Sequence, residues 1–163
     1  MSINIIVCMA ENGAIGADNQ LLYTLPEDMQ RFKHLTTSHT VIMGRNTYLS
    51  LPHGALPHRR NIVLSTTLKA VPGCEVYPST KEALAHIPPE EELFVMGGEE
   101  VYRALLPLAS RLYLTVVHDT PSHADTFFPA TVGKLLAQGW SIVLQKDMRE
   151  ETLNYTFLDL RKP

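Results

Sequence analysis

Residues 41–47 read Val-Ile-Met-Gly-Arg-Asn-Thr, an apolar run that stops at a glycine and continues into polar residues. A glycine lets the backbone approach a ligand closely, while Arg45 offers a forked cation and Thr47 a hydroxyl. Anions bind where such groups meet the free amides and positive dipole of a helix start. This stretch therefore predicts a buried strand whose carboxyl end faces an anionic ligand.

Two further strand ends have the same form. Residues 93–98 read Leu-Phe-Val-Met-Gly-Gly before a helix, and residues 62–66 read Ile-Val-Leu-Ser-Thr. In an open parallel sheet such strand ends line one crevice, which is where nucleotides bind. Together they favour a dinucleotide. The six-residue glycine fingerprint and the Gly-Lys-Ser phosphate loop are both missing, which excludes a standard Rossmann or kinase interpretation.

The alternation of short apolar runs with helical patterns predicts an α/β fold. Pro26 opens one helix, with Glu27 and Asp28 in its first turn, and Ser79 caps another at capping-box spacing from Glu82. Continuous apolar runs typical of central strands occupy residues 3–10, 40–44, 61–65, 93–97 and 112–117.

The carboxyl-terminal third predicts an antiparallel hairpin. Its strands are expected at residues 141–146 and 155–160, joined by the charged residues 147–151, which are too few for a helical crossover. We therefore expect a single twisted, mostly parallel sheet of about eight strands, with flanking helices and this hairpin at one edge. Functional loops are expected at residues 12–24, 51–59 and 119–125.

Composition narrows the class of protein. The chain has 163 residues and 18.2 kDa, which predicts one domain over residues 1–163. Its formal charge of −3 provides no positive field for nucleic acid or an anionic membrane. Two cysteines cannot build a disulfide framework, and no apolar run approaches the roughly 20 residues of a membrane span. We expect a cytoplasmic monomer that binds a small molecule.

Asp28 allows two interpretations. A carboxylate in the first turn of a helix commonly faces water and stabilises the helix dipole. Its helix also carries the apolar residues Met29 and Phe32, so the carboxylate could instead lie at the floor of a pocket. There it would accept two parallel hydrogen bonds from the amidine-like edge of a heterocycle. Periodicity alone leaves both open.

A metal site is a weaker alternative. His118, Asp119, His123 and Asp125 crowd one predicted loop. Their spacing fixes no tetrahedral ligand set on rigid elements, so no metal is predicted.

Five motifs, in order and in register from Ile3 to Leu160, resemble bacterial dihydrofolate reductase. The chance of such a match over nearly the whole chain is very small. The motifs are residues 41–47; residues 25–28 (Leu-Pro-Glu-Asp) before Phe32-Lys33; residues 96–98 before Val101-Tyr102; residues 112–115 (Leu-Tyr-Leu-Thr); and residues 125–129 (Asp-Thr-Phe-Phe-Pro).

The resemblance implies an enzyme of one-carbon metabolism that uses NADPH. In that family hydride passes from the reduced nicotinamide to C6 of dihydrofolate while a proton reaches N5. Asp28 matches the acid that anchors the pterin, and Thr115 matches the residue that supports this acid. Arg59 matches the arginine that pairs with the glutamate tail.

The resemblance also assigns the catalytic and substrate-binding positions. The catalytic positions are Asp28, Tyr23 and Leu21, although Leu21-Leu22-Tyr23 stands where bacterial members usually carry Met-Pro-Trp. A tyrosine there keeps an aromatic face and a polar tip. Cys8 matches a packing position rather than a nucleophile. The implied substrate-binding residues are Ile6, Val7, Cys8, Asp28, Met29, Phe32, Leu51, Leu56, Arg59, Met96 and Thr115.

The cofactor positions follow from the same resemblance, and Gly97-Gly98 matches a cis peptide in the family. Glu99 and Glu100 stand where the family often has a glycine and a basic residue, so NADPH rather than NADH is expected from Arg45, Ser65 and Thr66. The implied cofactor-binding residues are Cys8, Ile15, Gly16, Asn19, Gly44, Arg45, Asn46, Thr47, Ser65, Thr66, Met96, Gly97, Gly98, Tyr102 and Thr126.

Two other functions compete with this one. A reductase of the same fold could act on another heterocycle, as the pyrimidine reductase of riboflavin synthesis does; Asp28 together with Phe32 and Arg59 favours a folate. A nucleotide-binding module without catalysis would not need the pocket acid or the lid at residues 12–24. Cofactor oxidation that strictly depends on dihydrofolate separates the three.

Overall fold

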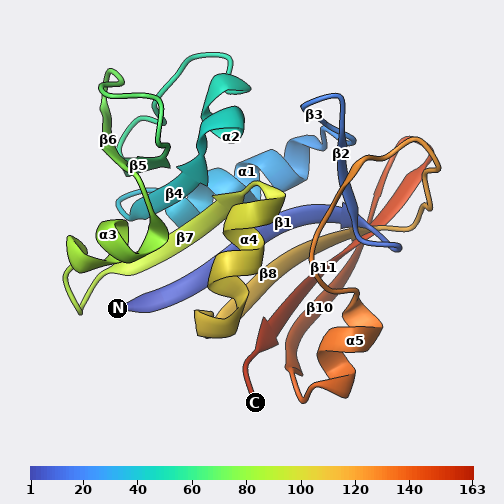
Figure 1. Cartoon of the computed structure of the whole chain (residues 1–163). Coiled ribbons are helices and arrows are strands. Elements are labelled where there is room, and N and C mark those ends of the chain that lie inside the picture. Colours follow the sequence, from blue (N-terminus) through green and yellow to red (C-terminus); the bar gives the residue numbers. More distant parts are fainter.

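A computed structural model describes residues 1–163, which form a sheet of eight strands in the order β10-β11-β8-β1-β7-β4-β5-β6 (Figure 1). The pairs β8–β11 and β10–β11 are antiparallel and all the others are parallel. The strands are β1 (Ser2–Ala10), β4 (Thr40–Gly44), β5 (Arg60–Leu64), β6 (Cys74–Tyr77), β7 (Glu92–Gly97), β8 (Arg111–Val117), β10 (Ser141–Glu150) and β11 (Leu153–Arg161).

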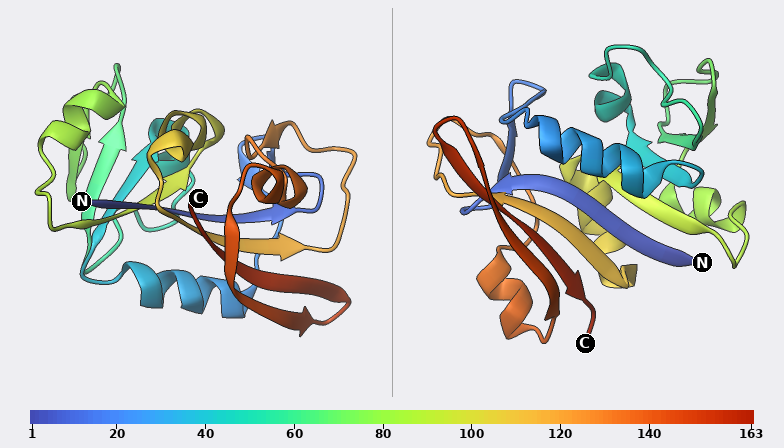
Figure 2. Two further views of the ribbon diagram at one scale, coloured as in Figure 1. Left: turned by 90° about the horizontal axis from the view of Figure 1, so that it is seen from below. Right: turned by 180° about the vertical axis from the view of Figure 1, so that it is seen from behind.

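Helices cover both faces of this sheet, and α1 lies on the face opposite α3, α4 and α5 (Figure 2). Ser79 caps α3 as predicted, because its hydroxyl accepts a hydrogen bond of 3.2 Å from the backbone N–H of Glu82. No helix combines the length and the apolar character needed to span a bilayer. The helices are α1 (Pro26–Thr36), α2 (Arg45–Leu49), α3 (Thr80–Ala85), α4 (Glu99–Leu105), the 3₁₀ helix η1 (Leu106–Leu108) and α5 (Val132–Ala137).

The main core lies between the sheet and the helices α3, α4 and α5. Alternate residues of β1, including Ile5 and Val7, point into it beside Leu114 of β8 and Leu105 of α4. A smaller cluster on the other face packs the partly buried side chains of Leu35 and Tyr48, from α1 and α2, against strands β4, β5 and β7. Each strand in the centre of the sheet is thus buried on both faces, which explains the continuous apolar runs.

A second sheet forms from the expected loops. Strands β2 (Ala14–Ala17), β3 (Gln20–Leu21) and β9 (Thr126–Phe127) pair in the order β3-β2-β9. Gly16 lies opposite Thr126 in this sheet. The segment after β1 and the segment after β8 therefore form one small unit above the carboxyl ends of the main strands, and the sequence pattern alone does not reveal it.

The predicted parallel strands and the hairpin are confirmed, with one correction. Residues 147–151 were expected to connect the hairpin, but β10 continues to Glu150 and only the turn around Glu151 joins it to β11. β10 is an edge strand with mostly exposed side chains, so charged residues do not end it. Strand β6 and helix α5 are additions that no sequence signal identified.

We predict that Ile5→Ala lowers the free energy of unfolding by about 2–5 kcal/mol, since Ile5 is completely buried in the central strand. The matched change Val143→Ala on edge strand β10, where the side chain is 41% exposed, should alter it by no more than about 0.5 kcal/mol. Urea unfolding of the two variants measures the difference, and equal losses would contradict this placement of the core.

Candidate active site

The candidate site begins where β1 and β7 separate. Their pairing ends at the rung Ile5–Val95. Beyond it, the hydroxyl of Tyr102 lies 2.9 Å from the carbonyl oxygen of Ile6 and 2.8 Å from that of Met96, so its proton serves both. The strand order also reverses beside β1, with β7 on one side and β8 on the other. Ligands of open α/β sheets bind at such a position.

Asp28 projects from the first turn of α1 toward β8. The helix start is fixed by Pro26 at its first position and by Leu25, which is buried. An oxygen of the Asp28 carboxylate accepts a hydrogen bond of 2.5 Å from the hydroxyl of Thr115, which is itself buried. The structure therefore supports the pocket interpretation of Asp28, and Thr115 is placed to hold it.

Burial raises the pKa of the Asp28 carboxyl above its ordinary value, because a charged form is disfavoured away from water. The hydrogen bond from Thr115 and the positive charge of Arg31 act in the opposite direction and lower that pKa. The carboxylate is thus held between a desolvating cleft and two groups that favour its charge.

Cys8 lies beside Thr115, since the two residues share a rung of the β1–β8 pair. Burial and the nearby charge of Asp28 raise the pKa of the Cys8 thiol, so the neutral thiol is the stable form. This supports a packing role rather than a nucleophile. Ile6 shares its face of β1 with Cys8, whereas the side chain of Val7 points into the core on the opposite face. Only the backbone of Val7 can meet a ligand in this cleft.

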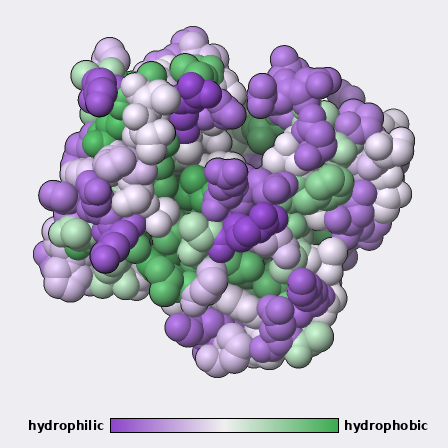
Figure 3. Space-filling view, in the orientation of Figure 1, coloured by the Kyte–Doolittle hydropathy of each residue, from purple (hydrophilic) through white to green (hydrophobic).

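The predicted apolar walls are only partly buried. Leu51, Leu56 and Met96 pack at the border of the cluster under α1 and α2. Met29 of α1 is 57% exposed. Figure 3 shows apolar side chains at the floor of the notch between the surface over α2 and the surface over β2 and β3. The cleft therefore offers apolar surface that no side chain of the chain covers.

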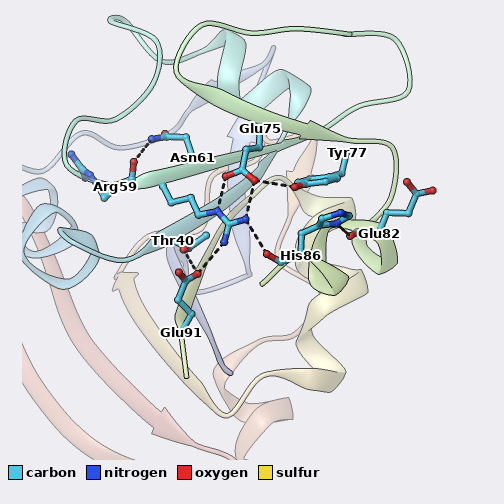
Figure 4. Close-up of polar contacts among 9 residues, drawn as sticks. Thr40, Arg59, Asn61, Glu75, Tyr77, Glu82, His86 and Glu91 are labelled. Carbon is cyan, nitrogen blue, oxygen red and sulfur yellow. Dashed lines mark hydrogen bonds and ion pairs between the residues drawn. The ribbon is translucent and has the colours of Figure 1, made fainter. Parts of the chain in front are cut away.

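The neighbouring arginines Arg59 and Arg60, at the start of β5, have different environments. The guanidinium of Arg60 pairs with Glu75 at 2.6 Å and with Glu91 at 3.4 Å, in a cluster from which Arg59 points away (Figure 4). Arg59 contacts the hydroxyl of Thr36 at 3.1 Å and lies 6.0 Å from the ring centroid of Phe32, with no carboxylate partner. Arg59 is thus the cation available to a ligand, and Arg60 is a structural one.

The predicted cofactor residues converge at the carboxyl ends of β4 and β7. Met43 and Gly97 share a rung there, and the following helices α2 and α4 begin at Gly44 and Gly98 without a side-chain cap. A Cβ added to Gly98 would lie 3.7 Å from the hydroxyl of Thr47, so a side chain would fill the space between the two helix starts. The Gly97–Gly98 peptide is cis, as the resemblance implies. This cradle of bare backbone fits a phosphate-bearing dinucleotide.

Side chains around the cradle are free for an anion. Arg45 and Asn46 are exposed and make no hydrogen bond or ion pair through their side chains. The hydroxyl of Ser65 accepts hydrogen bonds from the backbone N–H groups of Thr67 and Leu68, which fixes its position beside the exposed Thr66.

The two acidic residues at the start of α4, Glu99 and Glu100, have different environments. The Glu99 carboxylate accepts a 2.7 Å hydrogen bond from the backbone N–H of Phe127 and lies 3.6 Å from Arg103. The Glu99 carboxylate therefore has partners within the protein. Glu100 is exposed.

The predicted lid is the unit formed by β2, β3 and β9. Ile15 and Gly16 are buried in it, and Asn19 occupies the left-handed region with a φ of 61°. Asp125 accepts hydrogen bonds from the backbone N–H of Asp18 at 3.0 Å and from the hydroxyl of Thr126 at 2.7 Å, which lower the pKa of its carboxyl. These contacts tie the tip of the lid to β9.

Two predicted catalytic residues do not meet Asp28 in this conformation. The Tyr23 hydroxyl donates a hydrogen bond of 2.7 Å to Asp119, and Leu21 is 74% exposed. Tyr102 is buried with its hydroxyl engaged by backbone, so any contact with a cofactor uses the ring. The residues of the alternative metal site are also divided: His118 contacts Glu11 and Thr156, while Asp119 and Asp125 serve the lid.

Comparison with known proteins decides the family. The sequence profile described as Dihydrofolate reductase matches residues 2–162. The chain belongs to the dihydrofolate reductase family. It is 43% identical over 126 residues to the dihydrofolate reductase of Mycobacterium leprae, covering 76% of each chain. It is 36% identical over 164 residues to that of Bacillus subtilis, covering 98% of this chain and 94% of the relative.

A solved structure extends the likeness to the fold. Dihydrofolate reductase from Enterococcus faecalis, complexed with NADP(H) and RAB-propyl, superposes with a TM-score of 0.85 and 28% sequence identity. The match covers 98% of this chain and 95% of that one. The predicted family and fold are therefore confirmed.

Sequence reasoning missed several residues around the site of this family member. Arg31, three positions after Asp28 on α1, lies against Asp159 of β11 at 2.5 Å. Asp119 was considered only as a metal ligand, but it anchors Tyr23. The i, i+3 spacing of Asp28 and Arg31 was a visible signal, because such positions are neighbours on a helix. No sequence signal joined Arg31 to Asp159, which is 128 residues away.

We predict that Asp28→Asn raises the free energy of unfolding near neutral pH. Because the folded-state pKa of Asp28 is above its unfolded value, ionising this acid costs stability once the pH exceeds the unfolded value. The gain in the free energy of unfolding should be largest above the folded-state pKa of Asp28. It should vanish at acidic pH, where Asp28 of the wild type is protonated in both the folded and the unfolded state. Urea unfolding at several pH values tests this, and a variant less stable than wild type near neutral pH would contradict it.

Proposed function

We propose that the Asp28 cleft carries out the NADPH-dependent reduction of 7,8-dihydrofolate to tetrahydrofolate, with hydride transferred to C6 and a proton to N5. The carrying observation is the partly buried carboxylate of Asp28, held by the hydroxyl of Thr115. The glycine cradle at the carboxyl ends of β4 and β7 provides the second half of the site. The family of the chain supports this reaction.

Asp28 binds one edge of the pterin in this proposal. The carboxylate accepts hydrogen bonds from the 2-amino group and the N3 side of the ring, a pairing of planar donors with two oxygens. Thr115 fixes the carboxylate through the hydroxyl that it donates. The negative charge of Asp28 favours the form of the substrate that is protonated at N5, since an opposite charge stabilises a cation in a poorly solvated site.

The tail of the substrate lies toward Arg59. The ring of Phe32 is adjacent to this guanidinium, and Leu51 and Leu56 lie at the border of the apolar cluster nearby. Such an arrangement suits an aromatic group followed by a carboxylate, which is the chemistry of the aminobenzoyl-glutamate part of folate. It favours dihydrofolate over the pyrimidine substrate of a riboflavin-pathway reductase.

The cofactor is held by the cradle at Gly44 and the Gly97–Gly98 pair, with Thr47 between them. Arg45, Ser65 and Thr66 bind the 2′-phosphate in this proposal, which selects NADPH over NADH. When bound, NADPH supplies the hydride. The lid residues Ile15, Gly16, Asn19 and Tyr23 enclose the nicotinamide end and exclude water from it.

The assembly and location of the enzyme complete the proposal. We propose a cytoplasmic, single-domain monomer that binds no nucleic acid, in keeping with the formal charge of −3. Light scattering of the purified chain tests the monomer, a single cooperative unfolding transition tests the single domain, and cell fractionation tests the location.

We predict that Asp28→Asn keeps the fold and NADPH binding but lowers kcat/KM for dihydrofolate about 100-fold or more near neutral pH. The amide keeps the shape of the side chain but not the charge that favours protonation at N5. Steady-state rates as a function of pH measure this, with fluorescence titration of NADPH as the control. An unchanged pH–rate profile would remove Asp28 from the mechanism.

We predict that Arg59→Ala raises the KM for dihydrofolate about tenfold and changes kcat little, because it removes a charge-assisted contact remote from the reacting atoms. Arg60→Ala is the matched control. It should lower the melting temperature by breaking the pairs with Glu75 and Glu91, and leave KM near the wild-type value. Equal losses in KM and kcat for Arg59→Ala would contradict this role.

A further inference from the structure

Arg31 occupies an unusual position behind the pterin-binding acid. Its Nη2 atom lies 2.5 Å and 2.6 Å from the two carboxylate oxygens of Asp159. Its guanidinium carbon lies 4.6 Å from the ring centroid of Phe157 and 5.8 Å from that of Tyr113. The side chains of Arg31 and Asp159 are only 19% and 9% exposed. A cation is therefore fixed against two aromatic rings in a place with little solvent.

The registers of the helix and the sheet bring this cation close to Asp28. Asp28 and Arg31 are three positions apart on α1, and thus neighbours on its surface. On the sheet, Thr115 lies opposite Phe157. Two residues away on each strand, and on the same face, Tyr113 lies opposite Asp159. The helix pair Asp28 and Arg31 thus lies over the strand pair Thr115 and Tyr113.

Only one nitrogen of the Arg31 guanidinium is used by Asp159. Its Nε and Nη1 groups have no acceptor in the protein, and its positive charge lowers the pKa of Asp28. Asp159 holds Arg31 in place without cancelling its action on Asp28.

We propose that Arg31, held by Asp159 over Phe157 and Tyr113, is a positioning residue that keeps Asp28 charged and so sets the pH range in which this carboxylate binds the pterin. This inference rests on the proposed function. Arg31 acts through Asp28 and touches no substrate.

Other groups interact with the Asp28 carboxyl: the hydrogen bond from Thr115 lowers its pKa as Arg31 does, whereas the remaining neighbours are neutral. Cys8 on β1, Tyr102 on α4 and Tyr155 on β11 are neutral groups whose pKa values the charge of Asp28 raises. Thr115 on β8 donates the hydrogen bond. Arg31 is the cation of this set.

The test compares variants of the full-length enzyme that separate charge from shape. Arg31→Met removes the cation but leaves the poorly solvated Asp159 unpaired, which can destabilise the fold. The double variant Arg31→Met/Asp159→Asn removes both charges and avoids this problem. Arg31→Lys keeps the charge without the planar group. Arg161→Met is the matched control, since Arg161 is an exposed cation without an ion pair, two residues beyond Asp159 on the same strand.

The first measurement is an NMR titration of the aspartate carboxyl carbons in the NADPH complex, with Asp28→Asn used to assign the signal. We expect the midpoint for Asp28 to move to higher pH in the double variant and to remain at the wild-type position in Arg31→Lys and Arg161→Met. A midpoint that does not move in the folded double variant overturns the proposal. A midpoint that moves equally in Arg31→Lys overturns it as well, since the charge would then not be the cause.

The second measurement is the KM for dihydrofolate as a function of pH. In the double variant KM should rise near neutral pH and return to the wild-type value at alkaline pH, where Asp28 is ionised in both proteins, while kcat at alkaline pH is unchanged. A purely structural role would raise KM or lower kcat at every pH, and this result would count against the proposal. If Asp28→Asn kept full activity, the proposed function would fail, but the titration midpoints would still decide the role of Arg31.

Discussion

The arrangement of the site depends on one rung of the sheet, in which Cys8, Thr115 and Phe157 lie side by side on β1, β8 and β11. This rung places a neutral thiol, a hydroxyl donor and an aromatic ring under the first turn of α1. A slip of one residue between β1 and β8 would turn the hydroxyl of Thr115 into the opposite core. The fully buried neighbours Leu112 and Leu114 prevent that slip, because they would have to leave the main core. The packing of one face therefore fixes the chemistry of the other.

The two faces of the sheet also differ in what they contribute to stability and to function. The large cluster that includes Ile5, Leu105 and Leu114 lies between the sheet and α3, α4 and α5, on the face of the sheet opposite Asp28. On the cleft side the sheet is covered less completely, and Asp28 is desolvated there at a cost in stability. The fold tolerates this cost because the carboxylate is stabilised by Thr115 and Arg31, and because the main core is independent of it. Functional sites commonly contain groups that lower the stability of the fold but are needed for activity, and Asp28 is such a group.

Local patterns predicted what local forces decide. The apolar runs identified the central strands, since strands buried on both faces must be continuously apolar. Pro26 and Ser79 identified two helix starts because their backbone effects act over a few residues. The lid sheet was not predicted, because β2 and β9 are short and are joined by pairing across a long sequence separation. Asp28 was recognised by resemblance to a family, while its environment depends on Thr115 and Arg31, whose contacts only the folded chain creates.

The acidic residues that depart from a simple cofactor pattern act as links between the cradle and the lid. Glu99, at the first position of α4, accepts the backbone N–H of Phe127 in β9, and β9 pairs with β2 of the lid. Asp119 holds Tyr23 at the other end of the lid. An acid next to a phosphate site would weaken anion binding if its charge were free. The Glu99 carboxylate is instead hydrogen-bonded to β9 and paired with Arg103, so the start of α4 and the lid are held as one unit. A ligand bound at the start of α4 would therefore contact the segment that also holds the lid in place through Glu99 and β9.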